Sequence, residues 1–221
     1  MRRILIFIIT LLVSVPLVAQ EKAPAPPQIT PDALWDALAK GNQQFVAGSV
    51  AYNLLKDERA QLRDNQSPPV TILSCSDSRV PPELVFNQSL GALFVVRVAG
   101  NVADDFGLAS IEYAVSQGYT KLIVVLGHKR CGAVGASLGG TDPGTPALLK
   151  LAQRIRTSFV GIPYDARSPV NVQRAVEANA RAAAAQLLAS SKMIRDAVLT
   201  EQIKIVIAIY DLDTGEVKKI D

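Results

Sequence analysis

Four short runs of aliphatic residues constrain the fold of this chain most strongly. They are Val70–Ser74, Leu93–Arg97, Lys121–Gly127 and Ile203–Asp211, and each is rich in valine, isoleucine or leucine. None of them alternates cleanly between apolar and polar residues, as a strand with one solvent-exposed face does. Continuous apolar runs are typical of parallel strands that are covered on both faces. The four runs therefore predict the core of a parallel sheet.

Helical patterns lie before and between these runs. A first helix is expected to begin at Thr30, because threonine is favoured as an N-cap and Pro31 then occupies the first helical position. The alternation of strands and helices predicts an α/β fold, with a mostly parallel central sheet and helices on both faces. A last extended piece, Glu216–Ile220, would add an edge strand. Three further helices are predicted at Gly107–Gln117, Ala133–Leu138 and Val170–Ala189.

The first 29 residues differ in composition from the rest. A basic start and the apolar run Ile4–Val18 predict a signal peptide over residues 1–19. An uncleaved membrane anchor is the alternative, although the run is shorter than the roughly 20 residues that a spanning helix needs. Residues 20–29 form a proline-rich linker, and residues 30–221 are expected to fold as one domain. We therefore expect secretion, with a bacterial periplasm as the simplest destination.

The charge of the chain does not indicate a nucleic-acid partner. The formal net charge is +3, and two of the arginines that produce it lie in the predicted signal peptide. The remaining sequence has no dense cluster of lysine and arginine, which a nucleic-acid-binding surface requires.

The residues best suited to chemistry follow two of the predicted strands. Cys75 follows the first strand, and His128 and Cys131 follow the third; they are the only cysteines and the only histidine in the chain. Ligands bind at the carboxyl ends of the strands in open α/β sheets. Thiolates and imidazole suit Zn²⁺, and three protein ligands leave a fourth position open, as in catalytic zinc sites. Arg79, two residues after Asp77, can hold that carboxylate through a bidentate pair.

Two cysteines in an exported protein are also compatible with a single disulfide. The positions of Cys75 and Cys131 at the ends of two predicted strands, with a histidine beside one of them, favour zinc. An oxidising compartment could nevertheless join the two thiols before the metal arrives. We hypothesise that bound zinc protects them.

The paired motifs resemble those of the β-class carbonic anhydrases. The sequence C-S-D-S-R-V begins at Cys75 and H-x-x-C-G begins at His128, and the resemblance extends over residues 30–211. Intervening segments agree with it as well: Gly91–Arg97, Ala99–Asn101 and Ile111–Ala114.

The resemblance implies an enzyme that reversibly hydrates CO₂ to bicarbonate and a proton. Cys75, His128 and Cys131 would hold one Zn²⁺ per subunit, and a zinc-bound hydroxide would attack CO₂. Arg79 would hold Asp77, which accepts a hydrogen bond from the hydroxide. In the closed form of some family members, the residue matching Asp77 is itself the fourth metal ligand. Two thiolates reduce the effective charge of the metal, so we expect activity to rise into mildly alkaline pH.

Five residues match the substrate pocket of the plant-like subgroup. Gln66 matches a glutamine that hydrogen-bonds the substrate, and Phe94 and Tyr113 match aromatic residues that line the pocket. Ala99 falls where a valine is common, and the backbone N–H of Gly132 can donate to bicarbonate.

Two further features follow from the resemblance. Members that bicarbonate inhibits at a noncatalytic site carry a tryptophan where this chain has Ile72, so no bicarbonate switch is expected. With His128 on the metal, no histidine remains as a proton shuttle, and the proton must leave through water, buffer or Tyr113.

The resemblance also implies the strand order 2-1-3-4 and a homodimer or homotetramer. The N-terminal helix would reach across to the neighbouring subunit, which would supply part of the pocket. Two other functions stay open from the sequence. One is hydrolysis of carbon disulfide or carbonyl sulfide at the same zinc site. The other is a non-enzymatic role, as an exported anion-binding or structural protein whose cysteines are joined.

Overall fold

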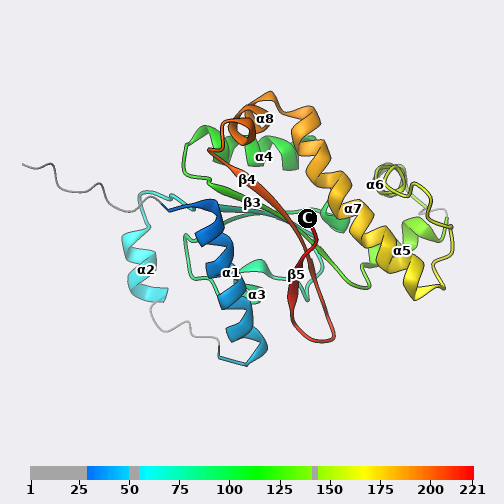
Figure 1. The fold of residues 1–221 in the computed structure, drawn as a ribbon, viewed down its shortest axis with the longest axis horizontal. Helices are drawn as coiled ribbons and strands as arrows, with labels where there is room; N and C mark the ends of the chain where they lie inside the picture. Colours follow the sequence, from blue (N-terminus) through cyan, green and yellow to red (C-terminus); the bar gives the residue numbers. More distant parts are fainter. Residues whose placement is uncertain (1–28, 50–54, 141–143) are drawn as a thin grey trace, which may run out of the picture.

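A computed structural model describes residues 29–49, 55–140 and 144–221. The predicted signal peptide and residues 20–28 of the predicted linker lie outside this part of the chain. The described residues form a sheet with the strand order β2-β1-β3-β4-β5, in which β5 alone is antiparallel to its neighbour (Figure 1). This confirms the predicted α/β fold, its strand order and the added edge strand. The strands are β1 (Val70–Ser74), β2 (Leu93–Arg97), β3 (Leu122–His128), β4 (Lys204–Tyr210) and β5 (Val217–Lys219).

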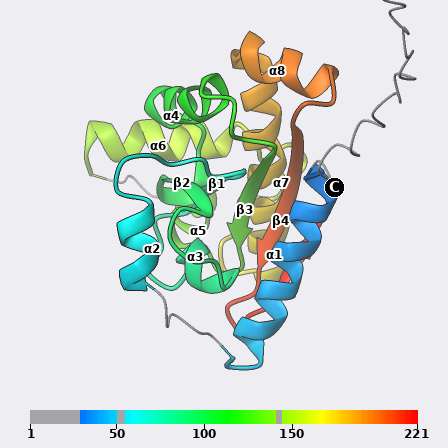
Figure 2. The same cartoon turned by 90° about the vertical axis from the view of Figure 1, so that its left-hand side faces the viewer.

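Helices cover both faces of the sheet, as Figures 1 and 2 show. One face carries α1 and α3, and the other carries α4 to α8, with the short 3-10 helix η1 between β2 and α4. The helices are α1 (Pro31–Val46), α2 (Leu55–Gln61), α3 (Pro82–Val85), η1 (Ala99–Asn101), α4 (Asp105–Ser116), α5 (Gly132–Leu138), α6 (Pro146–Arg156), α7 (Pro169–Ser190) and α8 (Lys192–Leu199).

Successive side chains of a strand enter opposite layers of the core. Ile72 packs with Leu38 of α1 and Phe86, whereas Leu73 packs with Ile111 of α4 and Leu187 of α7. Because both faces are buried, every position of β1 and β3 is apolar or fully enclosed. This explains why the strands appear in the sequence as continuous apolar runs.

The strand register brings three strand ends to one edge of the sheet. Ser74 at the end of β1 pairs with Arg97 at the end of β2 and with Leu126 near the end of β3. The loops that follow β1 and β3 therefore start side by side.

The start of α1 agrees with its predicted cap, since the Thr30 side chain accepts a hydrogen bond from the Ala33 backbone N–H. The other predicted boundaries are off by at most two residues. Four helices, α2, α3, α6 and α8, were not predicted. Among the described residues, no helix combines the length and the apolar character that crossing a membrane requires.

Candidate active site

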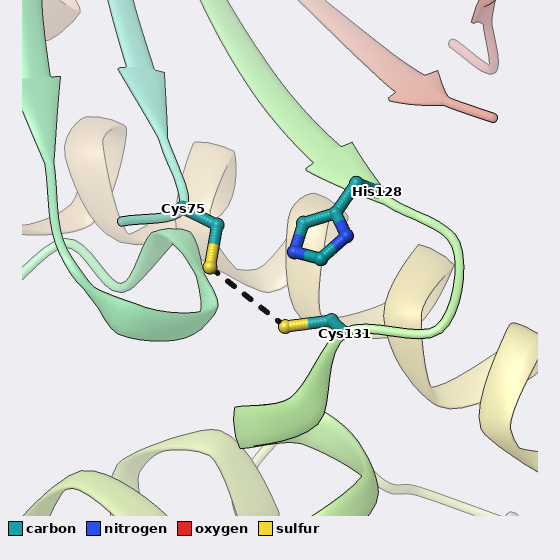
Figure 3. A group of neighbouring side chains, drawn as sticks. All are labelled: Cys75, His128 and Cys131. Atoms are coloured by element: carbon teal, nitrogen blue, oxygen red, sulfur yellow. Dashed lines mark hydrogen bonds between the residues drawn. The ribbon is translucent and has the colours of Figure 1, made fainter. Parts of the chain in front are cut away.

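Three ligand-bearing side chains converge at the carboxyl edge of the sheet (Figure 3). Cys75 directly follows β1, and His128 is the last residue of β3. The chain then turns tightly through Arg130, which has a positive φ of 53°, and Cys131 becomes the N-cap of α5. Cys75, His128 and Cys131 are 4%, 0% and 2% exposed, so the cluster is enclosed by the protein.

The spacing of these side chains fits a metal ion. Their ligand atoms all lie within 4.8 Å of one another, and the two sulfur atoms are 3.9 Å apart. A tetrahedral zinc with Zn–S bonds of about 2.3 Å holds two sulfurs about 3.8 Å apart. The two sulfur atoms of a disulfide would be only about 2.05 Å apart.

The hydrogen bonding of His128 also suits a metal ligand. Nδ1 of His128 lies 3.0 Å from the carbonyl oxygen of Lys129, and a donor there leaves a lone pair on Nε2. Nε2 is buried and has no hydrogen-bond partner among the described residues. A buried polar atom without a partner is costly, and a metal ion would satisfy it.

The two thiols are electrostatically unequal before any metal binds. A hydrogen bond from Cys131 lowers the pKa of Cys75, and the backbone N–H of Gly100, 3.2 Å from the Cys75 sulfur, lowers it further. The same sulfur–sulfur hydrogen bond raises the pKa of Cys131, because its proton is held beside the Cys75 thiolate. Metal binding requires both sulfurs as thiolates and would release any proton that the pair retains.

Asp77 is held beside the cluster by Arg79. The Arg79 Nε and Nη2 atoms donate to Asp77 Oδ1 and Oδ2 at 2.9 and 2.7 Å, and the Arg79 backbone N–H donates to Oδ1 at 3.0 Å. These bonds hold the pKa of the Asp77 carboxyl well below its usual range. Asp77 Oδ2 lies 3.8 Å from His128 Nε2, so the carboxylate faces the position that a metal would occupy.

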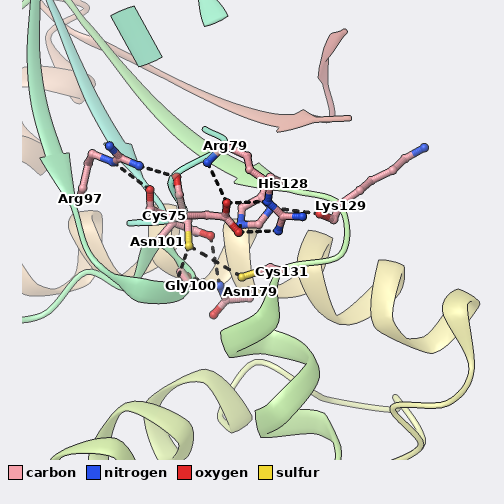
Figure 4. Close-up of polar contacts among 10 residues, drawn as sticks. Cys75, Arg79, Arg97, Gly100, Asn101, His128, Lys129, Cys131 and Asn179 are labelled. Carbon is pink, nitrogen blue, oxygen red and sulfur yellow. Dashed lines mark hydrogen bonds and ion pairs between the residues drawn. The ribbon is translucent and has the colours of Figure 1, made fainter. Parts of the chain in front are cut away.

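The sequence did not reveal the residues that support this loop. Arg97, at the end of β2, donates to the backbone carbonyls of Cys75 and Asp77 at 3.0 and 2.6 Å (Figure 4). Its position at a strand end is a signal that could have identified it. Asn179 of α7, which contacts Gly100, gave only the weaker signal of an amide flanked by alanines.

Two of the predicted pocket residues lie near the cluster. Gly132 follows Cys131, and both residues line a cavity of about 580 Å³ whose wall also includes Gln173. Ala99 lies in η1 directly before Gly100, and the backbone N–H of Gly100 contacts the Cys75 sulfur.

The other three lie elsewhere in the same chain. Gln66 is exposed and precedes β1, so it is at the opposite end of that strand from Cys75. Phe94 pairs with Thr71 in the first half of β2 and packs near Tyr113 of α4, with 6.2 Å between the ring centroids. A single subunit does not bring these three side chains to the metal ligands.

The neighbouring cations are neutralised by acids. Lys129 donates to Asp211 at 2.6 Å, and Arg130 forms an ion pair with Asp213. The positive charge of both side chains is therefore compensated within the same chain.

Comparisons with known proteins agree with this arrangement. Residues 70–217 match the family model described as carbonic anhydrase. Carbonic anhydrase 2 of Mycobacterium tuberculosis is 39% identical over 193 residues, which cover 86% of this chain and 92% of that protein. The carbonic anhydrase of Mycolicibacterium smegmatis is 49% identical over 119 residues, or 53% of this chain and 58% of that protein.

Solved structures show the same fold. A structure from work on two tetrameric β-carbonic anhydrases of Sordaria macrospora superposes with a TM-score of 0.68 at 25% identity, covering 86% of this chain and 97% of that one. A Coccomyxa β-carbonic anhydrase in complex with acetazolamide gives a TM-score of 0.63 at 26% identity, covering 83% and 84%. The chain therefore belongs to the β-carbonic anhydrase family of enzymes.

Proposed function

We propose that this protein is an exported, zinc-dependent carbonic anhydrase that reversibly hydrates CO₂ to bicarbonate and a proton. The observation that carries the proposal is the enclosed set of Cys75, His128 and Cys131, with an unpartnered His128 Nε2 facing the Asp77 carboxylate. These residues would hold one Zn²⁺ per subunit. When bound, Zn²⁺ acts as a Lewis acid and makes its water acidic enough to supply a nucleophile near neutral pH.

The protein's own groups then position the reactants. Asp77 accepts a hydrogen bond from the attacking oxygen and so sets which lone pair faces CO₂. Arg79 keeps that carboxylate ionised and away from the metal, in agreement with its two side-chain hydrogen bonds. If Arg79 released Asp77, this carboxylate would be free to serve as a further ligand to the metal. The backbone N–H of Gly132 would donate to bicarbonate, and Ala99 would form part of the pocket wall.

We infer that the active enzyme is a homodimer or a homotetramer. Gln66, Phe94 and Tyr113 lie away from the metal ligands of their own chain, so a substrate role requires them to face the site of a partner subunit. The Sordaria macrospora relatives are described as tetrameric. The proton would leave through water, buffer or Tyr113, because the chain has a single histidine, which would serve as a metal ligand.

We further place the chain in the plant-like subgroup, without a noncatalytic bicarbonate switch. Gln66 is the residue that supports this placement, and Ile72 is fully buried in the sheet where a tryptophan would mark the other subgroup. Hyperbolic rather than sigmoidal inhibition by bicarbonate is the expected behaviour. The apolar start of the sequence supports export to a periplasm, which cell fractionation would test.

The test is stopped-flow CO₂ hydration by the protein without residues 1–19, first stripped of metal and then reconstituted with Zn²⁺. Activity that appears with zinc, together with two free thiols after denaturation and chelation, would support the proposal. Carbon disulfide and carbonyl sulfide serve as parallel substrates. Turnover of these alone would reassign the substrate, and a zinc-independent result with no free thiols would indicate the disulfide-containing binding protein.

A further inference from the structure

The turn behind Cys75 is held in an unusual backbone conformation. Within η1, Gly100 has φ +67° and Asn101 has φ +46°, and the latter is uncommon for a residue with a side chain. The positive φ favours glycine at position 100, and a Cβ atom there would lie 2.8 Å from Ile155 Cδ1. This conformation aims the Gly100 N–H at the Cys75 sulfur, 3.2 Å away. Glycine adopts this conformation freely and asparagine is enriched in it, so contacts from neighbouring elements decide where the groups of the turn point.

Asn179 supplies a buried side-chain contact to this turn. It lies on α7 and is 4% exposed, and its Nδ2 atom donates to the Gly100 carbonyl at 2.6 Å (Figure 4). The same Nδ2 atom lies 3.5 Å from Asn101 Oδ1. A buried amide is costly unless it is hydrogen-bonded, and the neighbours of Asn179 on α7 are mainly alanines. Its strongest polar contact is therefore with the residue that donates to the Cys75 sulfur.

We propose that Asn179 is a positioning residue for the metal site, which acts by fixing the Gly100 N–H against the Cys75 sulfur. The inference rests on the proposed function, because it takes Cys75 to be a zinc ligand. An N–H donor to a ligating sulfur orients its lone pairs and withdraws electron density from the metal–sulfur bond. Groups that support ligands in this way typically change metal affinity or activity by about 10- to 100-fold.

The experiment compares zinc affinity, measured by competition with a chelator, and the sulfur-to-cobalt charge-transfer absorption of the Co²⁺-substituted protein. In Asn179→Ala the donor is lost, and alanine suits this part of α7. We expect zinc to bind about tenfold more weakly and the charge-transfer band to shift. Asn179→Leu, which also excludes a substituting water, should show the larger effect. Asn179→Gln keeps an amide donor and should recover most of the affinity.

Asn42→Ala is the matched control. Asn42 is also a buried asparagine whose Nδ2 donates to backbone carbonyls, those of Val85 and Gly215, at 3.0 and 2.8 Å. Its loss should lower the melting temperature and leave zinc affinity and the cobalt spectrum unchanged. Parental zinc affinity and an unchanged spectrum in both Asn179→Ala and Asn179→Leu would overturn the inference. Failure of the parent protein to bind zinc would instead overturn the proposed function, and this inference with it.

Discussion

Asp77 is the residue whose chemical role is most open to direct test. Asp77→Asn keeps the size of the side chain but removes the negative charge that pairs with Arg79. It also replaces one of the two acceptor oxygens by an amide that donates. We expect kcat/KM for CO₂ hydration to fall by at least about 100-fold, with zinc content unchanged. Stopped-flow assays and metal analysis measure the two quantities.

The matched control for this variant is Asp64→Asn. Asp64 also accepts two hydrogen bonds from a neighbouring arginine, Arg63, but it is 72% exposed and lies before β1, away from the cluster. Its variant should keep parental activity. An Asp77→Asn enzyme with full activity would show that the carboxylate does not position the reactants.

The sulfur atoms of Cys75 and Cys131 make a second prediction at this scale. They lie 3.9 Å apart, close enough to join after a small movement. We expect the thiol-oxidising reagent diamide, which takes up two electrons and two protons, to join the two thiols as a disulfide in the metal-free protein. Zinc-loaded protein should keep both thiols. A thiol count after quenching and denaturation distinguishes the two states, and an apoprotein that retains both thiols would refute the hypothesis of zinc protection.

At the scale of elements, α1 packs closely against the C-cap residue that ends α3. A Cβ atom on Gly41 would lie 1.9 Å from the Phe86 carbonyl oxygen. Gly41→Ala should therefore lower the free energy of unfolding by at least about 2 kcal/mol, as overpacking does. Denaturant unfolding of the zinc-loaded protein measures this change.

Gly135→Ala is the control for that substitution. A Cβ atom there would meet nothing within 4 Å, and Gly135 lies inside α5. Alanine should be neutral or stabilising by about 0.5–1 kcal/mol. Equal stability of the two variants would contradict the packing described for α1.

The elements also show what could be predicted from the sequence and why. The four parallel strands were found because burial on both faces makes each a continuous apolar run. Helix α6 has the same signals as α1, with Thr145 as the N-cap and Pro146 at the first position, so its start was predictable from the sequence. The long helical pattern ends at Ser190, and a new N-cap at Ser191 begins α8. Strand order came only from the family resemblance, because periodicity contains no information about neighbours.

Part of the candidate site could likewise be predicted from the sequence, and part could not. Cys75, His128 and Cys131 were predicted from their scarcity and from their positions after strands. Asn179 could not be placed, because it meets Gly100 across 79 residues of sequence. Such a contact depends on how α7 packs over η1, which local sequence patterns do not specify.

At the scale of the whole molecule, the proposed substrate role of Gln66 and Tyr113 requires a pocket that two subunits share. We expect Asp77→Asn protein and a Gln66→Ala/Tyr113→Ala protein to be poorly active alone. In a mixed dimer, one site would combine an intact Asp77 with an intact Gln66 and Tyr113 from the other chain, so unfolding and refolding the two together should restore activity. Roughly a quarter of all sites would be intact after random pairing of two-fold dimers.

The conditions under which activity recovers show whether the two variants must exchange subunits. Recovery only after refolding, and not after simple mixing of folded proteins, would tie it to subunit exchange. If the mixture is no more active than the average of its components, the pocket is not shared between chains.

The central claim is zinc-dependent hydration of CO₂, and its pH profile tests that claim most directly. Arg79 lowers the pKa of Asp77, so this ion pair stabilises the folded protein at every pH above the usual pKa of an aspartate. The stabilisation is lost only in stronger acid. Asp77 therefore stays ionised between about pH 6.5 and 9 and adds no step to the profile. Stopped-flow measurements in strong buffer should show activity that needs zinc and rises with pH over this range. Activity that is flat across the range, or that persists without zinc, would contradict the account.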